Sequence, residues 1–317
     1  MESFGKWPSF GKWPSWLVPF LCLLATGSLL GLSTNFAKLA AAYGLGPLPF
    51  LAWSLTGAAV LLIAAGGGAA GLPTLTARVM EYAIVSALLS LAAPTLLFFS
   101  AVPHVGAGFV SIAIAFPPLL TYIGALALRI EPFRVQRAVG VALALVGAAV
   151  IVIPKLAVPE SEVSWIVATL VGPVLLAAGN LYRTIRWPPG ARADLLANCM
   201  VATAAVMLMM VGIAFGSTLL PADIRLRAVL LIAVQAVAFA VQYRMFFIVQ
   251  KYGGPVYISL LGSIGAAVGV PVAVFLLGET PPDGLAMSAV LIASGVGLVT
   301  YGRSGAAPAI TDQEISK

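Results

Sequence analysis

Most of the 317-residue chain consists of long apolar runs that alternate with short polar segments. A helix that crosses a membrane needs about 20 consecutive and mostly apolar residues. Ten runs of about this length follow one another, at residues 16–42, 48–65, 82–102, 105–128, 138–153, 165–185, 195–215, 228–249, 256–277 and 285–301. The short connections leave no room for a soluble domain, so the pattern predicts an all-α, polytopic membrane protein with ten transmembrane helices.

The composition supports a protein whose main solvent is lipid. Hydrophobic residues make up 61% of the chain and charged residues only 9%, and the mean hydropathy is +1.06. A soluble domain carries about 25% charged residues, because its surface must face water. This difference excludes a soluble nucleic-acid-binding module, a disordered chain and a secreted disulfide scaffold. Cys22 and Cys199 both lie inside apolar runs, and we interpret them as small buried hydrophobic residues.

The distribution of Lys and Arg predicts the orientation, since cytoplasmic loops of membrane proteins carry an excess of both residues. Of the 17 Lys and Arg residues, Lys155, Arg225 and Arg227 lie on one side and Lys38 lies inside the first run. The other 13 lie on the side of the N-terminus. Both termini are therefore expected to be cytoplasmic. Segment 1–15 repeats the hexapeptide SFGKWP, whose Lys and Trp residues suit an anchor among lipid headgroups.

A shift of 148 residues superimposes parts of the second half of the chain on the first. It pairs Glu131 with Glu279 and Gly147 with Gly295, and helices three to five fall on helices eight to ten in the same order. Because five helices are an odd number, the two halves must lie in opposite orientations. The predicted organisation is an N-terminal cytoplasmic segment 1–15, a first repeat 16–154, an extracytoplasmic linker 155–164, a second repeat 165–302 and a cytoplasmic tail 303–317. Inverted repeats are typical of secondary transporters, although a duplication can also build a stable bundle without transport.

Several short motifs in the chain resemble those of a known family. The segment 105–147, with its Pro117 and Glu131, is similar to the EamA repeat of the drug/metabolite transporter superfamily, and the repeat recurs around Glu279. The stretch 31–38 resembles the opening motif of that family. The resemblance implies a ten-helix transporter in a bacterial inner membrane. It is greatest to the amino-acid and metabolite exporters, of which the YddG-like aromatic amino-acid exporters are one branch.

None of the eleven Asp and Glu residues falls in the middle of an apolar run. Proton-driven antiporters commonly use a buried carboxylate that exchanges protons. Its absence favours a facilitator, or a weakly coupled carrier, that lets the substrate run down its gradient. The single histidine, His104, is expected in a solvated loop. No carboxylate pair, histidine cluster or phosphate-binding loop points to an enzyme, a cofactor or a metal site.

Candidate substrate-binding residues are polar or aromatic side chains that lie deep in the apolar runs. On the helix predicted over 228–249, Gln235, Phe239 and Gln242 share one face. An amide can donate to a carboxylate and accept from an ammonium group, although such glutamines also link helices to one another. The other candidates are Asn35, Lys38, Trp53, Ser90, Phe98, Ser111, Tyr122, Asn180 and Ser259. Lys38 and Arg183 lie near helix ends, where snorkelling to the interface is an alternative explanation.

These patterns together predict a monomeric transporter that works by alternating access. It would move small metabolites outward, with amino acids, aromatic or otherwise neutral, as the expected substrates. Its partners would be a small-molecule substrate and the lipid bilayer, without nucleic acid or cofactor. Two alternatives stay open: an exporter of nucleobases, sugars or drugs, and a membrane sensor or scaffold that transports nothing.

Overall fold

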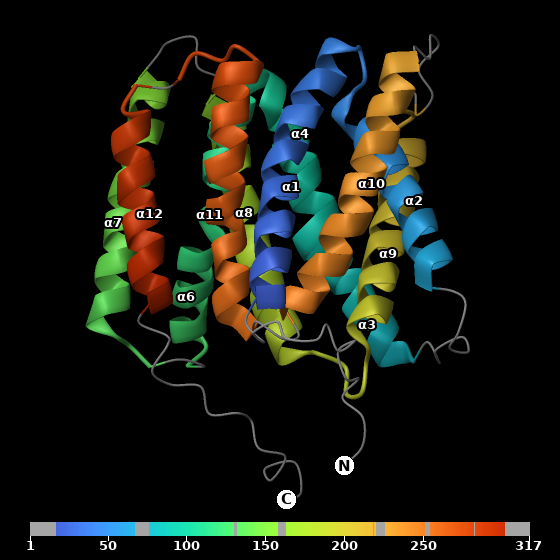
Figure 1. Cartoon of the computed structure of the whole chain (residues 1–317), viewed down its shortest axis with the longest axis horizontal. Coiled ribbons are helices and arrows are strands. Elements are labelled where there is room, and N and C mark those ends of the chain that lie inside the picture. The colour runs from blue at the N-terminus through green and yellow to red at the C-terminus, as the bar shows by residue number, and fades with distance from the viewer. Residues whose placement is uncertain are drawn as a thin grey trace, which may run out of the picture.

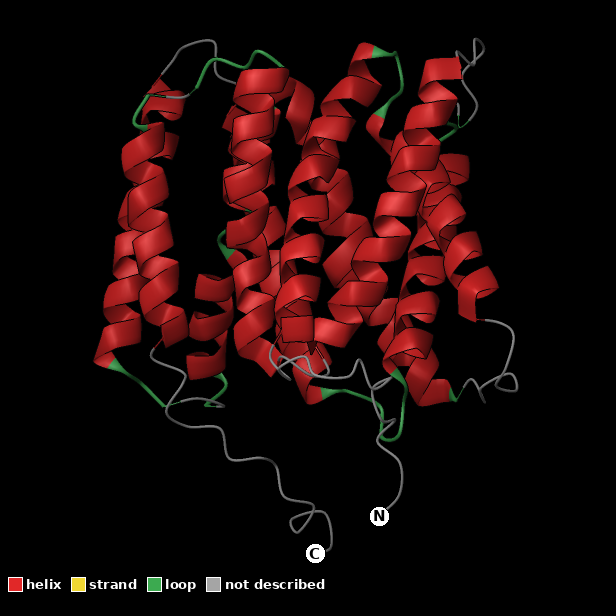
Figure 2. Ribbon diagram, in the orientation of Figure 1, coloured by secondary structure: helices red, strands yellow, loops and turns green. Residues whose placement is uncertain are grey.

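The computed structural model describes residues 17–66, 76–129, 132–157, 163–217, 219, 226–250, 254–281 and 283–301. Throughout this part of the chain the regular structure is helical (Figures 1 and 2). The helices are α1 (Leu17–Ala42), α2 (Pro47–Gly66), α3 (Ala77–Ala87), α4 (Ala93–Val105), α5 (Ala107–Ala113), α6 (Pro117–Ala127), α7 (Val135–Ala157), α8 (Val163–Ile185), α9 (Ala193–Ala214), α10 (Leu226–Ile248), α11 (Gly254–Pro271) and α12 (Leu285–Tyr301). Two π-helical turns, η1 (Leu88–Ala92) and η3 (Val272–Leu276), continue α3 and α11.

Length and hydropathy identify the molecule as a multi-pass membrane protein. Within the described residues, six helical stretches are long and apolar enough to cross a bilayer. They are Pro47–Ala65, Ala77–Val105, Ala107–Ala127, Val163–Ile185, Ala193–Ala214 and Leu226–Ile248. Large hydrophobic side chains such as Phe275 (83% exposed) and Ile213 (73% exposed) point away from the protein. Water would penalise this arrangement and lipid does not, so these side chains mark the lipid-facing surface.

The helices run side by side, and consecutive ones mostly point in opposite directions (Figure 1). Helix α1 lies centrally and packs against α10 and α11, whereas α7 and α12 form a pair at one edge. Helix α1 begins and α12 ends on the same side of the molecule, which we call the cavity end. The opposite side, which carries Lys38 and Glu279, is called the closed end.

Small residues allow α1 and α11 to approach each other closely. A methyl group added at Gly31 would collide with the backbone of Gly265 and Gly269 on α11. Inside a membrane no hydrophobic force drives helices together, so van der Waals contact between glycine-rich faces supplies much of the association. The α1–α11 contact therefore depends on glycine at this position.

The run predicted over 105–128 forms two helices rather than one. Gly106, with φ at 87°, turns the chain from α4 into α5. Pro117 and Pro118 carry no N–H, so the carbonyl oxygens of Ala113 and Ile114 lack their usual helical donors. The segment 114–116 consequently leaves the α-helix, and α6 starts at Pro117. This break lies well inside the molecule (Figure 2).

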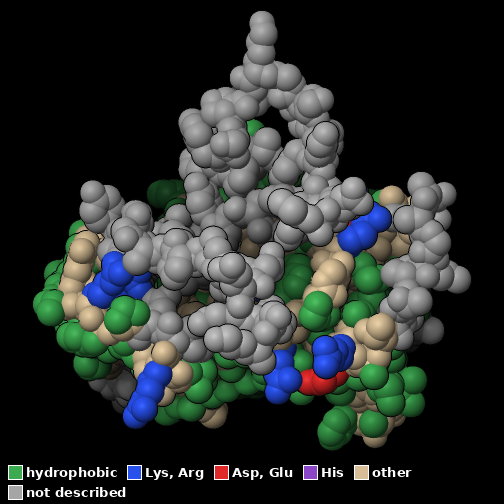
Figure 3. All heavy atoms as spheres, turned by 90° about the horizontal axis from the view of Figure 1, so that it is seen from below, with side chains coloured by type: hydrophobic (Ala, Val, Ile, Leu, Met, Phe, Trp, Pro, Cys, Tyr) green, Lys and Arg blue, Asp and Glu red, His purple; other side chains and the backbone are tan. Residues whose placement is uncertain are grey.

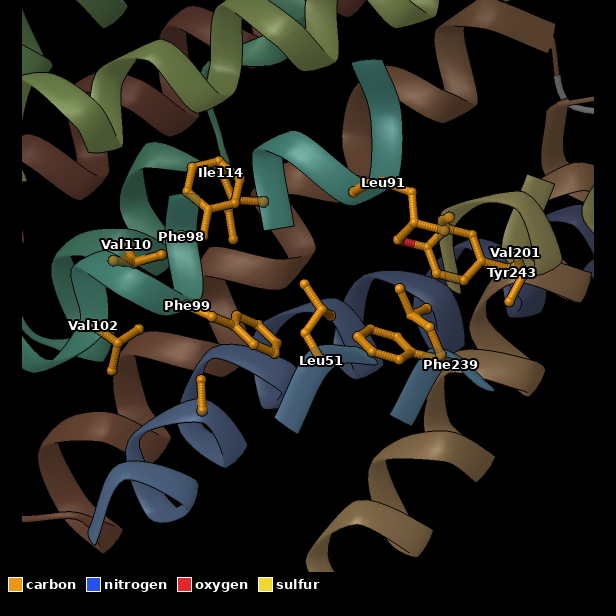
Figure 4. Close-up of a cluster of buried hydrophobic side chains, with 14 of the residues drawn as sticks. Leu51, Leu91, Phe98, Phe99, Val102, Val110, Ile114, Val201, Phe239 and Tyr243 are labelled. Carbon is orange, nitrogen blue, oxygen red and sulfur yellow. The ribbon is translucent and has the colours of Figure 1, made fainter. Parts of the chain in front are cut away.

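A buried apolar cluster fills the centre of the molecule on the side of α2, α4 and α10. Phe99 stacks on Phe50 with ring centroids 5.8 Å apart and on Phe239 at 6.5 Å. Leu51 from α2 lies between the rings of Phe99 and Phe239 in the close-up of this region (Figure 4). These side chains join α2, α4 and α10 in one apolar core.

Candidate functional site

A cavity of 80 Å³ lies among α1, η1, the α5–α6 break, α8, α9, α10 and α11. Its position follows from its lining: Arg183 and Phe246 lie two residues from the ends of α8 and α10, at the cavity end of both helices. It is lined by Thr26, Leu30, Ser90, Ile114, Pro117, Pro118, Leu176, Asn180, Arg183, Met200, Gln242, Tyr243, Phe246, Leu261 and Gly262. Helices from both halves of the chain therefore contribute to one cavity.

Arg183 is the only charged residue in this lining, and its side chain is 1% exposed. Its Nη2 donates a hydrogen bond of 2.6 Å to Oδ1 of Asn180, one helical turn earlier on α8. Its Cζ lies 5.0 Å from the centroid of the Phe246 ring. Nε and Nη1 have no hydrogen-bond partner. The cavity thus holds a buried guanidinium with unused donors and no carboxylate among its lining residues.

Other polar atoms in the cavity wall also lack partners. Oε1 of Gln242, Oγ of Ser90 and Oγ1 of Thr26 are buried and make no hydrogen bond. Most buried polar groups in proteins are hydrogen-bonded, so a group of unpaired donors and acceptors around one cavity is unusual. Such a group can bind a polar solute or water.

Aromatic rings continue from the cavity into the core. The ring centroids of Phe246 and Tyr243 are 6.3 Å apart, and those of Tyr243 and Phe239 are 5.9 Å apart. Phe239 then stacks on Phe99. One side of the cavity is therefore apolar and aromatic, while its polar groups come from Thr26, Ser90, Asn180, Arg183 and Gln242.

Toward the closed end, hydrogen bonds between distant segments seal the space above the cavity. Thr34 and Ser111 share a hydrogen bond of 2.8 Å between their hydroxyl groups. Nδ2 of Asn35 donates to the carbonyl oxygens of Gly31 at 3.0 Å and Gly269 at 3.1 Å. These bonds fasten α1 to α5 and α11 directly above the cavity.

Glu279 closes the same end of the molecule. Its Oε1 accepts hydrogen bonds from Nζ of Lys38 at 2.9 Å and from the backbone N–H of Ala107 at 2.7 Å. Its Oε2 accepts from the N–H of Gly108 at 2.9 Å. Burial raises the pKa of Glu279, but the hydrogen bonds from Lys38, Gly108 and Ala107 outweigh burial and hold that pKa below its ordinary value. The carboxylate is therefore ionised at neutral pH and joins α1, the start of α5 and the segment after η3.

The predicted site residues fall into separate regions of the structure. Those that line the cavity are Ser90, Asn180 and Gln242. Those in the seal at the closed end are Asn35, Lys38 and Ser111. Those packed elsewhere in the interior are Phe98, Gln235 and Phe239. Within the last group, Gln235 donates to Oγ of Ser33 at 3.0 Å and so links α10 to α1.

Two further predicted residues lie away from the cavity lining, and the side chain of a third is not described. Trp53 donates from Nε1 to the carbonyl oxygen of Leu219 at 2.9 Å, which ties α2 to the chain after α9. The hydroxyl of Tyr122 accepts from the N–H of Arg134 at 3.1 Å, and its ring lies 5.2 Å from the guanidinium of Arg137. The side chain of Ser259 is not among those described.

Sequence reasoning left Arg183 and Glu279 out of the candidate site. Arg183 lies near a helix end, where snorkelling toward water is the common arrangement for an arginine. Its spacing of three residues from Asn180 was the available signal, because that spacing puts both on one helix face. Glu279 belongs to the repeat motif of the second half, but no local pattern shows that it folds back onto α5. Among the described residues, no group of three or more His, Cys, Asp or Glu could hold a metal ion.

Comparisons with known proteins agree with this architecture. No curated protein matches the sequence. A solved structure titled "Crystal structure of protein" superimposes with a TM-score of 0.61 at 19% identity, covering 90% of this chain and 97% of that chain, so the likeness concerns the fold. Residues 17–153 match the EamA-like transporter family, which supports the drug/metabolite transporter superfamily and indicates a membrane transporter of small solutes.

Proposed function

We propose that the protein transports small metabolites, with amino acids as the expected class, by exposing the cavity alternately to the two sides of the membrane. The observation that carries this proposal is the cavity itself, because its buried polar groups have no partners within the protein. A scaffold has no use for such a cavity, since unpaired buried groups destabilise a fold. A carrier requires these groups for its solute.

The proposed architecture is ten transmembrane helices in two inverted five-helix repeats. What supports it is the relation between α7 and α12, which the 148-residue shift superimposes. The two helices pack against each other and run in opposite directions (Figure 1). Inverted repeats give a carrier two conformations of similar energy, one open to each side.

The proposed orientation places the cavity end in the cytoplasm of a bacterial cell, with the protein in the inner membrane. Seen from that end, Lys and Arg side chains lie around the edge of the molecule, with one acidic patch among them (Figure 3). An excess of positive charge is typical of the cytoplasmic side. In this orientation the cavity lies toward the inner side, and the hydrogen bonds of Asn35 and Glu279 lie between it and the outer side, as expected of an exporter before it releases its substrate.

Facilitated rather than proton-driven movement is favoured by the position of the acidic groups. The described cavity lining contains no Asp or Glu. Glu279 is engaged by Lys38 and two backbone N–H groups in the sealed state. A carboxylate held ionised in this way is poorly suited to carrying a proton across the membrane at neutral pH.

Solute counterflow in liposomes tests the proposal. Purified full-length protein is reconstituted with unlabelled L-leucine, L-phenylalanine or L-alanine inside, and uptake of the labelled amino acid is followed. We expect transient accumulation of at least one of them above protein-free liposomes, without an imposed proton gradient. Accumulation that needs a proton gradient would overturn the facilitator mechanism. Absence of uptake for every amino acid, nucleobase and sugar tried would overturn transport and favour the sensor or scaffold alternative.

A variant pair links the transport to the cavity. Gln242→Ala removes an unpaired amide from the lining, whereas Trp53→Phe changes a side chain outside it. We expect Gln242→Ala to slow counterflow about tenfold, as loss of one polar contact to the solute would do. Trp53→Phe should leave the rate within about twofold. Equal rates in both variants would mean that the solute does not pass Gln242.

A further inference from the structure

We propose that Arg183 binds the carboxylate of the transported solute, so that the carrier selects solutes with a carboxylate over the same solutes without one. This inference rests on the proposed function and narrows its substrate class. Burial of the charged Arg183 side chain is energetically costly. A buried ionised group without a counter-charge is strongly unfavourable in a protein interior, and an arginine cannot relieve that cost by losing its proton.

The described structure offers Arg183 no anion. Its one hydrogen bond goes to the neutral amide of Asn180. The face of the Phe246 ring supplies a cation–π contact, which is weaker than an ion pair. The ion pairs resolved elsewhere, Lys38 with Glu279 and Arg192 with Asp194, involve other residues. An anion in the cavity would therefore supply the negative counter-charge that the described protein residues do not provide.

The free atoms around Arg183 suit a carboxylate. Nε and Nη1 lack partners, and a planar guanidinium donates in pairs to a carboxylate. Oε1 of Gln242 is an unpaired acceptor on the same cavity, and it can receive a hydrogen bond from the ammonium group of an amino acid. The aromatic and aliphatic lining, with Tyr243, Phe246 and Leu176, provides for an apolar side chain.

The single positive charge of the cavity lining favours a carboxylate over a phosphate. Arg183 is the single cation among the lining residues. A monocarboxylate would neutralise it, and a zwitterion would place its negative end there. A phosphate dianion would leave a net negative charge in a buried site, which is unfavourable without a second cation. The cavity is therefore expected to discriminate against phosphate esters and inorganic phosphate.

Thermal unfolding of the purified full-length protein in detergent tests binding without transport. The probes are L-leucine, 4-methylpentanoate, L-leucinamide and inorganic phosphate, which separate the carboxylate, the ammonium group and the phosphate. A ligand that binds only the folded protein raises the unfolding temperature. We expect L-leucine and 4-methylpentanoate to raise it by several degrees at millimolar concentration, and L-leucinamide and phosphate to leave it unchanged.

Three variants separate a binding role from a structural one. Arg183→Gln removes the charge, and Arg183→Lys keeps the charge but lacks the planar guanidinium that can donate two parallel hydrogen bonds. Arg192→Gln removes an exposed, paired arginine at the same end of the molecule. We expect Arg183→Gln to unfold at or above the wild-type temperature without ligand, because an uncompensated buried charge is gone. It should lose the stabilisation by carboxylates. Arg183→Lys should bind them about tenfold more weakly, and Arg192→Gln should behave as wild type.

The outcomes distinguish this inference from the proposed function. If the protein transports solutes but L-leucinamide is carried and binds as well as L-leucine, carboxylate recognition is wrong and transport stands. Stabilisation by phosphate equal to that by 4-methylpentanoate would replace the carboxylate with a general anion site. If Arg183→Gln lowers the unfolding temperature and retains the carboxylate response, the residue is structural. Carboxylate binding without any counterflow would overturn the proposed function alone.

Discussion

Glu279 joins three segments of the chain through its two carboxylate oxygens, so its protonation affects the closed end as a whole. Hydrogen bonds from Lys38 and from the N–H groups of Ala107 and Gly108 hold its pKa below the ordinary value. For a carboxyl group with a lowered folded-state pKa, the stabilisation is fully present above the unfolded value of about 4.3. It is lost as the pH falls through the lower, folded value.

We predict that Glu279→Gln lowers the free energy of unfolding by about 1–3 kcal/mol at pH 7, since an amide replaces charge-assisted hydrogen bonds. Thermal unfolding in detergent from pH 7 down to pH 3 measures the difference between wild type and variant. The difference should stay constant down to about pH 4.3 and shrink below it, because only the wild type loses its charge. Asp283→Asn, a change in the same loop outside the observed contacts of Glu279, is the control. A difference that shrinks already near pH 6 would mean that the pKa is raised.

At the scale of elements, the break between α5 and α6 places backbone and proline rings in the cavity wall. Ile114, Pro117 and Pro118 all line the cavity. Across the cavity wall, Gly262 on α11 lies so close to the carbonyl of Ile114 that a methyl group there would collide with it. The break is therefore part of the cavity and is also held by α11.

The double variant Pro117→Ala with Pro118→Ala should restore two N–H groups and favour a continuous helix from α5 into α6. We expect counterflow to fall at least about tenfold, because the rejoined helix changes the cavity wall, while the unfolding temperature stays equal or rises. Pro49→Ala is the matched control, since Pro49 lies in the first turn of α2, where the N–H that alanine would add has no acceptor within the helix. Unchanged counterflow in the double variant would show that the break is dispensable.

The close contact between α1 and α11 should make the stability of the protein sensitive to substitution at Gly31. At Gly31 a methyl group meets backbone, which cannot rotate away as a side chain can. Gly31→Ala should therefore destabilise the protein by about 1–3 kcal/mol, measured as thermal unfolding in detergent. Gly297→Ala in α12 is the control, because its added methyl group points into open space. Equal stability of the two variants would mean that α1 and α11 adjust without strain.

At the scale of the whole molecule, apolar run length carries most of what can be predicted from the sequence. The runs predict where the helices lie, because that effect is local, but run length gave residues 105–128 as one helix and did not locate the break before Pro117. The contact of Arg183 with Phe246 and the partners of Glu279 depend on how distant helices pack, which no local pattern determines. Gln242, Asn180 and Ser90 could be chosen as deep polar residues, but helical periodicity could not separate them from Gln235, which links two helices.

Alternating access requires the seal at the closed end to open, and the ion pair of Lys38 and Glu279 lies across that seal. Removing the carboxylate should weaken the sealed state by about 1.4 kcal/mol or more and so raise the open population about tenfold. We predict that Ser111→Cys, in a Cys22→Ala, Cys199→Ala background, reacts about tenfold faster with a membrane-impermeant thiol reagent when Glu279→Ala is added. The reagent is supplied from the closed end.

Ser111 is the appropriate reporter because it is fully buried beneath Glu279 and hydrogen-bonded to Thr34 in the sealed state. Ser217→Cys, just after α9 at the same end, reports access without crossing the seal and should react equally in both backgrounds. Arg192→Gln at the cavity end should not change either rate, since it breaks an ion pair far from the seal. If labelling of residue 111 is unchanged by Glu279→Ala while counterflow continues, the molecule opens elsewhere, and the hydrogen bonds of Glu279 stabilise the fold without controlling access.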